Sequence, residues 1–333
     1  MTTTKNNAPR LLYTFCILHS ALCICVAAEP LKLIQTIPLP GVKGRFDHFA
    51  MDANGDRLFV AALGNNTVEV IDLAAGKRIQ SVAGMSKPCG VLYLEEQDQI
   101  AVANGDDGTL KLLNAASFDL VKSIGSLDDA DNLRFDSKWK RIYIGYGGGA
   151  VAVSDPYTLQ ISGEIKLPGH PESFQLEKQG SRIFVNVPDA KQIAVADRDK
   201  KTVVATWPMD KFQANFPMSF DEPNHRLLVG CRKPARLLIL DTQTGKQVQD
   251  LAISGDTDDL FYDAKRKRIY ISCGEGSLDT ISQESADSYK PLSKLHTAAG
   301  ARTCFFSPDL DRLYLAVPDR GNQKAEIRVY QPE

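Results

Sequence analysis

The stretch Arg57-Leu-Phe-Val-Ala recurs in seven versions along this chain, each an apolar segment led by a basic or polar residue. The other versions are Gln99-Ile-Ala-Val-Ala, Arg141-Ile-Tyr-Ile-Gly, Arg182-Ile-Phe-Val-Asn, Arg226-Leu-Leu-Val-Gly, Arg268-Ile-Tyr-Ile-Ser and Arg312-Leu-Tyr-Leu-Ala. The aliphatic residue in second place, here termed the marker, returns every 41 to 44 residues. Seven copies at so constant a period indicate a repeat architecture built from one supersecondary unit.

Each repeat has the pattern of four short strands. An apolar segment such as Leu133-Arg-Phe comes before the marker strand, and two alternating segments such as Thr67-Val-Glu-Val-Ile-Asp and Lys77-Arg-Ile-Gln-Ser-Val follow it. Turns rich in Gly, Asn and Asp separate the strands, and no stretch keeps a helical period over three turns. Four strands in a repeat of this length are typical of one propeller blade, so we expect an all-β, seven-bladed β-propeller with four-stranded blades.

The two ends of the chain are expected to close the ring. The seventh repeat stops three residues after Ala325-Glu-Ile-Arg-Val-Tyr, before any fourth strand. An unassigned strand-like stretch, Leu31-Lys-Leu-Ile-Gln-Thr-Ile, lies ahead of the first repeat. We predict that this N-terminal strand completes the last blade, because closure removes the open interface between the first and last blades.

The first repeat resembles a known propeller family. Leu58-Phe-Val-Ala-Ala, a turn, and Thr67-Val-Glu-Val-Ile-Asp-Leu-Ala-Ala-Gly-Lys are similar to the repeat of the YVTN-type seven-bladed β-propeller proteins. The resemblance covers residues 31–333, although no copy keeps the full pattern. It implies the propeller fold. Relatives on this scaffold include lactonase-like enzymes, secreted binding proteins and haem- or quinone-dependent redox domains, so the fold leaves the activity open.

Residues 1–28 are predicted to be a secretory signal peptide, which leaves residues 29–333 as the mature propeller. Lys5 and Arg10 precede an uncharged, mostly apolar run from Leu11 to Val26, and Val26-Ala-Ala offers small residues for cleavage. The run is too short for a permanent anchor, and nothing later in the chain is apolar enough to span a membrane. We therefore expect a periplasmic or secreted protein, monomeric and without a membrane span after cleavage.

Charge and cysteine content exclude several classes of protein. The 39 basic and 41 acidic side chains nearly balance, which argues against a disordered chain and against a nucleic-acid partner. Cys89, Cys231, Cys273 and Cys304 remain after signal cleavage. Cys231 and Cys273 occupy equivalent positions in neighbouring blades, whose sheets pack about 10 Å apart, and a disulfide needs Cα atoms within about 7 Å. We expect free, buried thiols.

One position in every repeat, eleven residues before the marker, indicates either a binding site or polar residues that only satisfy backbone groups where a loop meets a strand. Propeller ligands usually bind at the axial mouth, on the loops that enter each innermost strand, and this position falls there. It holds Asp47, Cys89, Asp131, Glu172, Phe216, Asp258 and Arg302. Four carboxylates on one axis would repel each other unless a positive group lies among them or some are protonated. Arg302 and Arg45 are candidates for that positive group, and a divalent ion such as Ca²⁺ is the other solution.

Polar neighbours extend this candidate site. The residues that follow the acids are His48, Asn132, Ser173 and Asp259, all of which carry oxygen or nitrogen. His48 and His170 both belong to entry loops and could act as a general base near neutral pH, although loop histidines more often serve in hydrogen bonding. Asn215 comes from a separate loop. In a regular strand the acids would share a face with Phe49, Leu133, Phe174 and Leu260, and some would point at a neighbouring blade.

Two functions follow from this pattern. The first is an exported binding or scaffold propeller whose acidic axial mouth takes a small ligand or a protein partner, with Arg45, Asp131, Asn132, His170, Asn215, Asp259 and Arg302 as ligand-binding residues. The alternative is a divalent-metal-assisted hydrolase of lactones or esters. In that alternative Asp47, Asp131, Glu172 and Asp258 hold the metal, possible ions including Ca²⁺, and His48 is the catalytic residue that acts on water.

Overall fold

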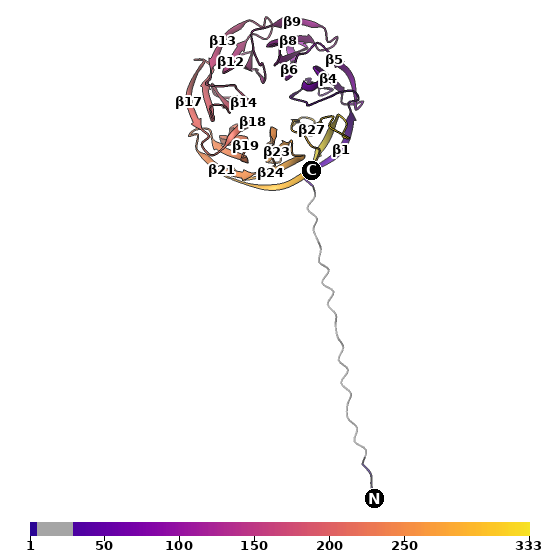
Figure 1. Ribbon diagram of the computed structural model, residues 1–333. Coiled ribbons are helices and arrows are strands. Elements are labelled where there is room, and N and C mark those ends of the chain that lie inside the picture. Colours follow the sequence, from indigo (N-terminus) through magenta and orange to yellow (C-terminus); the bar gives the residue numbers. More distant parts are fainter. Residues whose placement is uncertain (5–28) are drawn as a thin grey trace.

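The described residues form a closed ring of seven blades around a central channel (Figure 1). The computed structural model describes residues 1–4 and 29–333. Each blade is a four-stranded antiparallel sheet, which confirms the predicted all-β, seven-bladed β-propeller. The predicted signal peptide, residues 1–28, falls mostly outside the described residues and stays a prediction. Within the part of the chain that is described, no helix is long and apolar enough to cross a membrane.

The strands fall into four sets according to their place in the blade. The inner strands, which face the channel, are β2 (Phe49–Met51), β6 (Pro88–Leu94), β10 (Leu133–Asp136), β14 (Phe174–Leu176), β18 (Gln213–Asp221), β22 (Thr257–Asp263) and β26 (Cys304–Ser307). The second strands, which carry the repeat markers, are β3 (Arg57–Ala62), β7 (Gln99–Asn104), β11 (Arg141–Tyr146), β15 (Arg182–Val187), β19 (Arg226–Lys233), β23 (Arg268–Cys273) and β27 (Arg312–Val317).

The outer half of each blade follows the same order. The third strands are β4 (Thr67–Asp72), β8 (Thr109–Asn114), β12 (Ala150–Ser154), β16 (Gln192–Asp197), β20 (Ala235–Asp241), β24 (Ser277–Ser285) and β28 (Glu326–Pro332). The outermost strands are β5 (Lys77–Val82), β9 (Leu120–Ile124), β13 (Ile161–Lys166), β17 (Thr202–Pro208), β21 (Gln247–Ala252), β25 (Ser288–His296) and β1 (Leu31–Pro38). Single 3₁₀ turns lie at η1 (Leu63–Asn65), η2 (Glu95–Gln97) and η3 (Glu222–Asn224).

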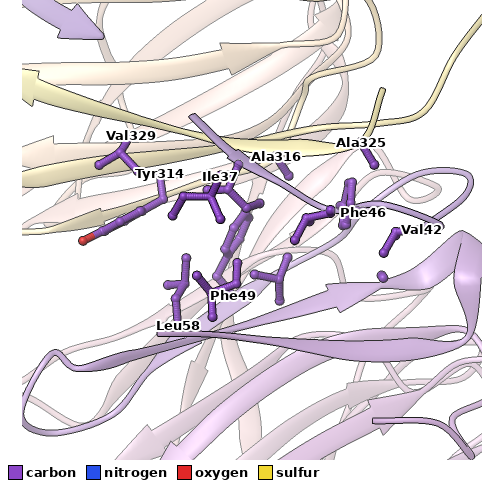
Figure 2. Close-up of a cluster of buried hydrophobic side chains, with 14 residues drawn as sticks. Ile37, Val42, Phe46, Phe49, Leu58, Tyr314, Ala316, Ala325 and Val329 are labelled. Carbon is purple, nitrogen blue, oxygen red and sulfur yellow. The ribbon is translucent and has the colours of Figure 1, made fainter. Parts of the chain in front are cut away.

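The N-terminal strand closes the ring as predicted. β1 pairs antiparallel with β28, from Leu31 opposite Pro332 to Pro38 opposite Glu326. The seventh blade therefore contains both ends of the propeller. Figure 2 shows the interface that results, where Ile37 of β1 and Tyr314 of β27 point toward Leu58 and Phe49 of the first blade. Burial of this apolar surface joins the last blade to the first and leaves no open blade face.

Alternation along the second strands builds the core between blades. In β3, Leu58 and Val60 pack toward the seventh blade, whereas Phe59 and Ala61 pack toward the second. Successive side chains of a strand point to opposite faces, so an almost wholly apolar marker strand fills the layers on both of its sides. This explains why the markers are the most regular feature of the sequence. The four cysteines Cys89, Cys231, Cys273 and Cys304 are free and buried, as predicted.

Candidate functional site

Six of the seven blades carry the same irregularity where the chain enters the inner strand, whereas in the seventh Arg302 N–H donates to Gly300 O instead. In the first blade, Asp47 N–H donates to Ala61 O at 2.8 Å and Ala61 N–H donates to His48 O at 3.0 Å. Two residues of the inner edge thus oppose one residue of the second strand, which is a β-bulge. The same arrangement places Asp131–Asn132 opposite Gly145 and Glu172–Ser173 opposite Asn186. Register shifts at Cys89–Gly90, Phe216–Pro217 and Asp258 mark it in three further blades.

The bulges turn consecutive side chains toward the channel axis. They meet in a cavity of about 160 Å³ at one end of the channel, here termed the mouth cavity. Its lining consists of Arg45, Asp47, His48, Lys87, Cys89, Asp129, Asp131, Asn132, His170, Glu172, Ser173, Phe216, Arg232 and Asp258. Regular alternation would send one member of each consecutive pair away from this cavity, as the strand pattern suggested. The bulges of the first, third and fourth blades explain why both members of their pairs line it.

The structure brings most of the sequence-predicted site residues together. Those that line the mouth cavity are Arg45, Asp47, His48, Asp131, Asn132, His170, Glu172 and Asp258. Three others lie elsewhere. Asp259 lies deeper in the channel, with Oδ1 3.3 Å from His48 Nδ1. Asn215 is completely buried and donates to Asn186 Oδ1, whereas Arg302 pairs with Asp256 at 2.8 Å and does not line the cavity.

Sequence reasoning missed several residues of this cavity. Cys89 occupies the same repeat position as the four acids, and that signal was visible, but the residue was assigned only as a buried thiol. The repeat position does not mark Arg232, which comes from the far end of β19 and which the sequence showed only as part of a small basic cluster, Arg232-Lys-Pro-Ala-Arg. Its guanidinium carbon lies 3.7 Å from the centre of the Phe216 ring, and Nη2 is 2.5 Å from Asp258 Oδ1. Stacking and charge together fix this side chain at the cavity wall.

Positively charged side chains lie beside the carboxylates of the mouth cavity. His48 Nε2 lies 3.7 Å from Asp47 Oδ1, and His170 Nε2 lies 3.7 Å from Asp131 Oδ2. His170 Nδ1 is also 2.8 Å from Gly147 O, which orients the ring. The two histidines, Arg232 and Arg45, whose Nη2 lies 3.5 Å from Asp47 Oδ2, therefore supply positive charge beside the converging acids, and Arg302 acts only from a distance. The cavity is strongly polar, with charges of both signs.

Both histidines are held in the charged form. Burial alone would lower the pKa of His48, but the carboxylates of Asp259 and Asp47 outweigh it and raise this pKa to about 10. Burial likewise opposes protonation of His170, and Asp131 together with the Gly147 carbonyl raises its pKa to about 9. At neutral pH each imidazole is a cation and a hydrogen-bond donor. Neither has the free lone pair that a general base requires.

Two carboxyl groups of the cavity have pKa values well above the ordinary range of such groups. Burial, together with the charges of Asp131 and Asp258, raises the pKa of Glu172 to about 8. Burial raises the pKa of Asp47 to about 7, although His48 opposes the shift. Among the described residues, no side chain forms an ion pair or a hydrogen bond with the Glu172 carboxyl group. At neutral pH Glu172 is thus mostly protonated and Asp47 partly so, and a positive group brought into this cavity would favour the ionised form of both.

Three potential metal ligands lie close together in the same cavity. Ligand atoms of Asp47, Cys89 and Asp131 all lie within 4.8 Å of one another. Asn132 is 2% exposed, and its Oδ1 has no hydrogen-bond partner among the described residues. Glu172 and Asp258, which the sequence also proposed as metal ligands, line the cavity but lie outside this group. A thiol beside two carboxylates suits a borderline ion such as Zn²⁺ better than Ca²⁺, which prefers oxygen ligands.

A larger cavity continues down the channel from the mouth. It measures about 440 Å³, is here termed the channel chamber, and shares His48 and Ser173 with the mouth cavity. The inner strands line it with mostly apolar side chains, including Phe49, Phe261 and Phe305. The channel thus has a polar end and an apolar interior.

Fold and site together define a seven-bladed β-propeller with a charged cavity at the mouth of its channel. Solved structures share the fold. A chain of hydrazine synthase from Kuenenia stuttgartiensis aligns over 84% of this chain and 95% of its own, with a TM-score of 0.73 and 16% identity. A chain of the mitotic checkpoint complex aligns over 98% of this chain and 99% of its own, with a TM-score of 0.78 and 14% identity.

These similarities establish the architecture alone, because identities this low are common among propellers of unrelated activity. No family model matches the chain, and no curated protein matches its sequence.

Proposed function

We propose that this protein is an exported binding propeller whose mouth cavity takes a cation, either a divalent metal ion or a positively charged group of a small ligand or protein partner. The observation that carries the proposal is the unmatched carboxyl group of Glu172 in a cavity where bulges from several blades converge. Asn132 Oδ1 supports it, since an unpartnered buried acceptor is costly unless a ligand satisfies it. A cation would use both groups.

Calorimetric titration of the chelator-stripped protein with Zn²⁺ and with Ca²⁺ tests this proposal. We expect one cation per chain, and at least tenfold weaker binding in the Asp131→Asn variant, which removes a charged oxygen ligand. Glu95→Gln, an exposed change in η2, is the matched control and should bind as the native chain does. If neither ion binds the native protein, the divalent-metal form of the proposal is wrong, and only a positively charged group of a ligand or partner remains.

The metal-assisted hydrolase is the second candidate function. The grouping of Asp47, Cys89 and Asp131 favours it, because a metal held there would face an open cavity and could polarise a carbonyl group. The protonated state of His48 argues against the role of base that the sequence suggested. Turnover of lactones or simple esters that appears with Zn²⁺ and disappears in Asp47→Asn would support the hydrolase, and metal binding without turnover would leave the binding role.

Export, membership of the YVTN-type repeat proteins and a monomeric state belong to the same proposal. The apolar run between Leu11 and Val26 supports export, and the repeat pattern of residues 31–333 supports the family. N-terminal sequencing of the protein recovered from the periplasm or medium of an expressing bacterium tests the first point. We expect the mature chain to begin near Glu29, and an intact N-terminus in the cytoplasm would contradict export.

A further inference from the structure

The channel chamber contains one arginine, Arg134, that forms no ion pair with any described residue. Arg134 on β10 lines the chamber, and no carboxylate of the described residues lies within 4.0 Å of its guanidinium group. The other charged groups of the chamber already have partners. Asp259 accepts from Cys304 N–H at 3.0 Å and lies 3.3 Å from His48 Nδ1. Arg134 is therefore the free charge of the chamber among the described residues.

Two hydrogen bonds hold the side chain of Arg134 in place, and some of its N–H donors have no partner among the described residues. Nη1 donates to Leu133 O at 2.8 Å, Nη2 donates to Ser173 Oγ at 3.2 Å, and the guanidinium carbon lies 5.4 Å from the centre of the Phe174 ring. A guanidinium carries five N–H donors, so three remain without a partner among the described residues. Ser173 accepts from Arg134 and keeps its own O–H free to donate. Burial lowers the pKa of Arg134, and the carboxylates of Asp259 and Asp131, which form no ion pair with it, offset this only in part.

The wall across the channel from Arg134 is aromatic. Phe305 stacks on Phe49 at 6.5 Å between ring centres and meets Phe261 edge-on at 5.8 Å. These rings come from the seventh, first and sixth blades, whereas Arg134 comes from the third, so they face each other across the ring. A chamber of about 440 Å³ with apolar walls and a few fixed polar groups has the properties of a small-molecule site.

We propose that the channel chamber binds a small organic carboxylate with an apolar, aromatic body. The carboxylate lies against the guanidinium of Arg134 and the hydroxyl of Ser173, which present the paired donors that two carboxylate oxygens accept. The ring of the ligand packs against Phe305 and its neighbours on the opposite wall. This site adjoins the mouth cavity, with which it shares Ser173, but its charge selectivity is opposite, and an amine of the same shape would be rejected because Arg134 would repel it.

Calorimetric titration of the full-length mature protein with three matched probes tests the inference. The probes are 3-phenylpropionate, its neutral amide and 3-phenylpropylamine, which share one ring and differ in charge. We expect the carboxylate to bind at least tenfold more tightly than the amide, because charge-assisted hydrogen bonds are about twice as strong as neutral ones. We expect no binding of the amine. Equal binding of carboxylate and amide, or no binding of the carboxylate, would overturn the proposal.

Variants separate the two parts of the proposed site. Arg134→Gln should remove the preference for carboxylate over amide, whereas Phe305→Leu should weaken both probes and leave the preference intact. Arg320→Gln, which removes the same charge from an exposed loop, is the control and should bind as the native chain does. Asp131→Asn, which alters the mouth cavity, should also leave carboxylate binding in place. If Arg134→Gln keeps its native thermal midpoint and its preference for carboxylate, the assignment of Arg134 is wrong.

Discussion

Glu172 shows how a single residue sets the charge balance of the mouth cavity. Asp258 has Arg232, Asp131 has His170 and Asp47 has His48, but no partner of Glu172 lies among the described residues. Burial and the neighbouring carboxylates raise its pKa from 4.5 to about 8. The folded chain thus keeps a proton that the unfolded chain releases, and the stability linked to this group is present below pH 4.5 and lost as pH rises through 8.

The Glu172→Gln variant should therefore gain stability only at high pH. Glutamine mimics the protonated side chain, so the two proteins should unfold alike near pH 5, and the variant should be more stable at pH 9 by about 2 kcal/mol. This value takes roughly half of about 1.4 kcal/mol per pKa unit, because water enters the open cavity and screens the charges. Urea unfolding at both pH values measures the difference. A difference that stays the same at pH 5 and pH 9 would show that Glu172 is neutralised by other means.

Among the strands, β1 has a distinct role, because it pairs with β28 and so joins the N-terminal end of the propeller to its C-terminal end. Ile37 is 0% exposed and lies in the cluster between the seventh and first blades, whereas Ile34 on the same strand is 45% exposed. Ile37→Ala should lower the free energy of unfolding by about 3 kcal/mol through lost burial and the cavity left behind. Ile34→Ala should change it by less than about 0.5 kcal/mol. Equal effects in urea unfolding would mean that this interface does not hold the ring together.

Gly90, on the inner strand of the second blade, allows the backbone at Asp131 of the third blade to approach closely, and this positions Asp131 in the mouth cavity. A Cβ atom added to Gly90 would lie 2.2 Å from Asp131 O and 3.0 Å from Leu133 Cγ. Gly90→Ala should push the third blade away, lower the free energy of unfolding by about 2 kcal/mol and weaken cation binding at the mouth. Gly125→Ala, where the added atom meets nothing within 4 Å, is the control and should alter neither quantity. Native binding in Gly90→Ala would show that the position of Asp131 is not critical.

The strand patterns of the sequence were sufficient to predict the blades, but not the geometry of the residues around the mouth cavity. The markers and the closing strand Leu31–Pro38 obey local rules, period 2 within a strand and a constant period between repeats, so the sequence alone predicts them. The bulges break period 2, so strand alternation alone could not predict that both members of Asp47–His48, Asp131–Asn132 and Glu172–Ser173 line one cavity. The partners of Arg302 and Arg232 depend on loop geometry, and no spacing rule connects Arg302 with Asp256 or Arg232 with Phe216.

For the whole molecule, closure should make the seven blades unfold together. In an open repeat array each unit contacts only its neighbours, and the end units can unfold first. Here the first and last blades contact each other, so every blade has two neighbours. The buried thiols of Cys89, Cys231, Cys273 and Cys304 lie in the second, fifth, sixth and seventh blades and report on four parts of the ring.

Pulsed thiol labelling at increasing urea, followed peptide by peptide with mass spectrometry, tests this cooperativity. In the native chain the four cysteines should become reactive at one urea concentration, because losing any blade exposes the faces of two others. In Ile37→Asp, which places a charge in the closing interface, Cys304 should react at lower urea than Cys231, since the seventh blade then lies at an open end and the fifth does not. Four separate midpoints in the native chain would show that the blades unfold independently in spite of closure.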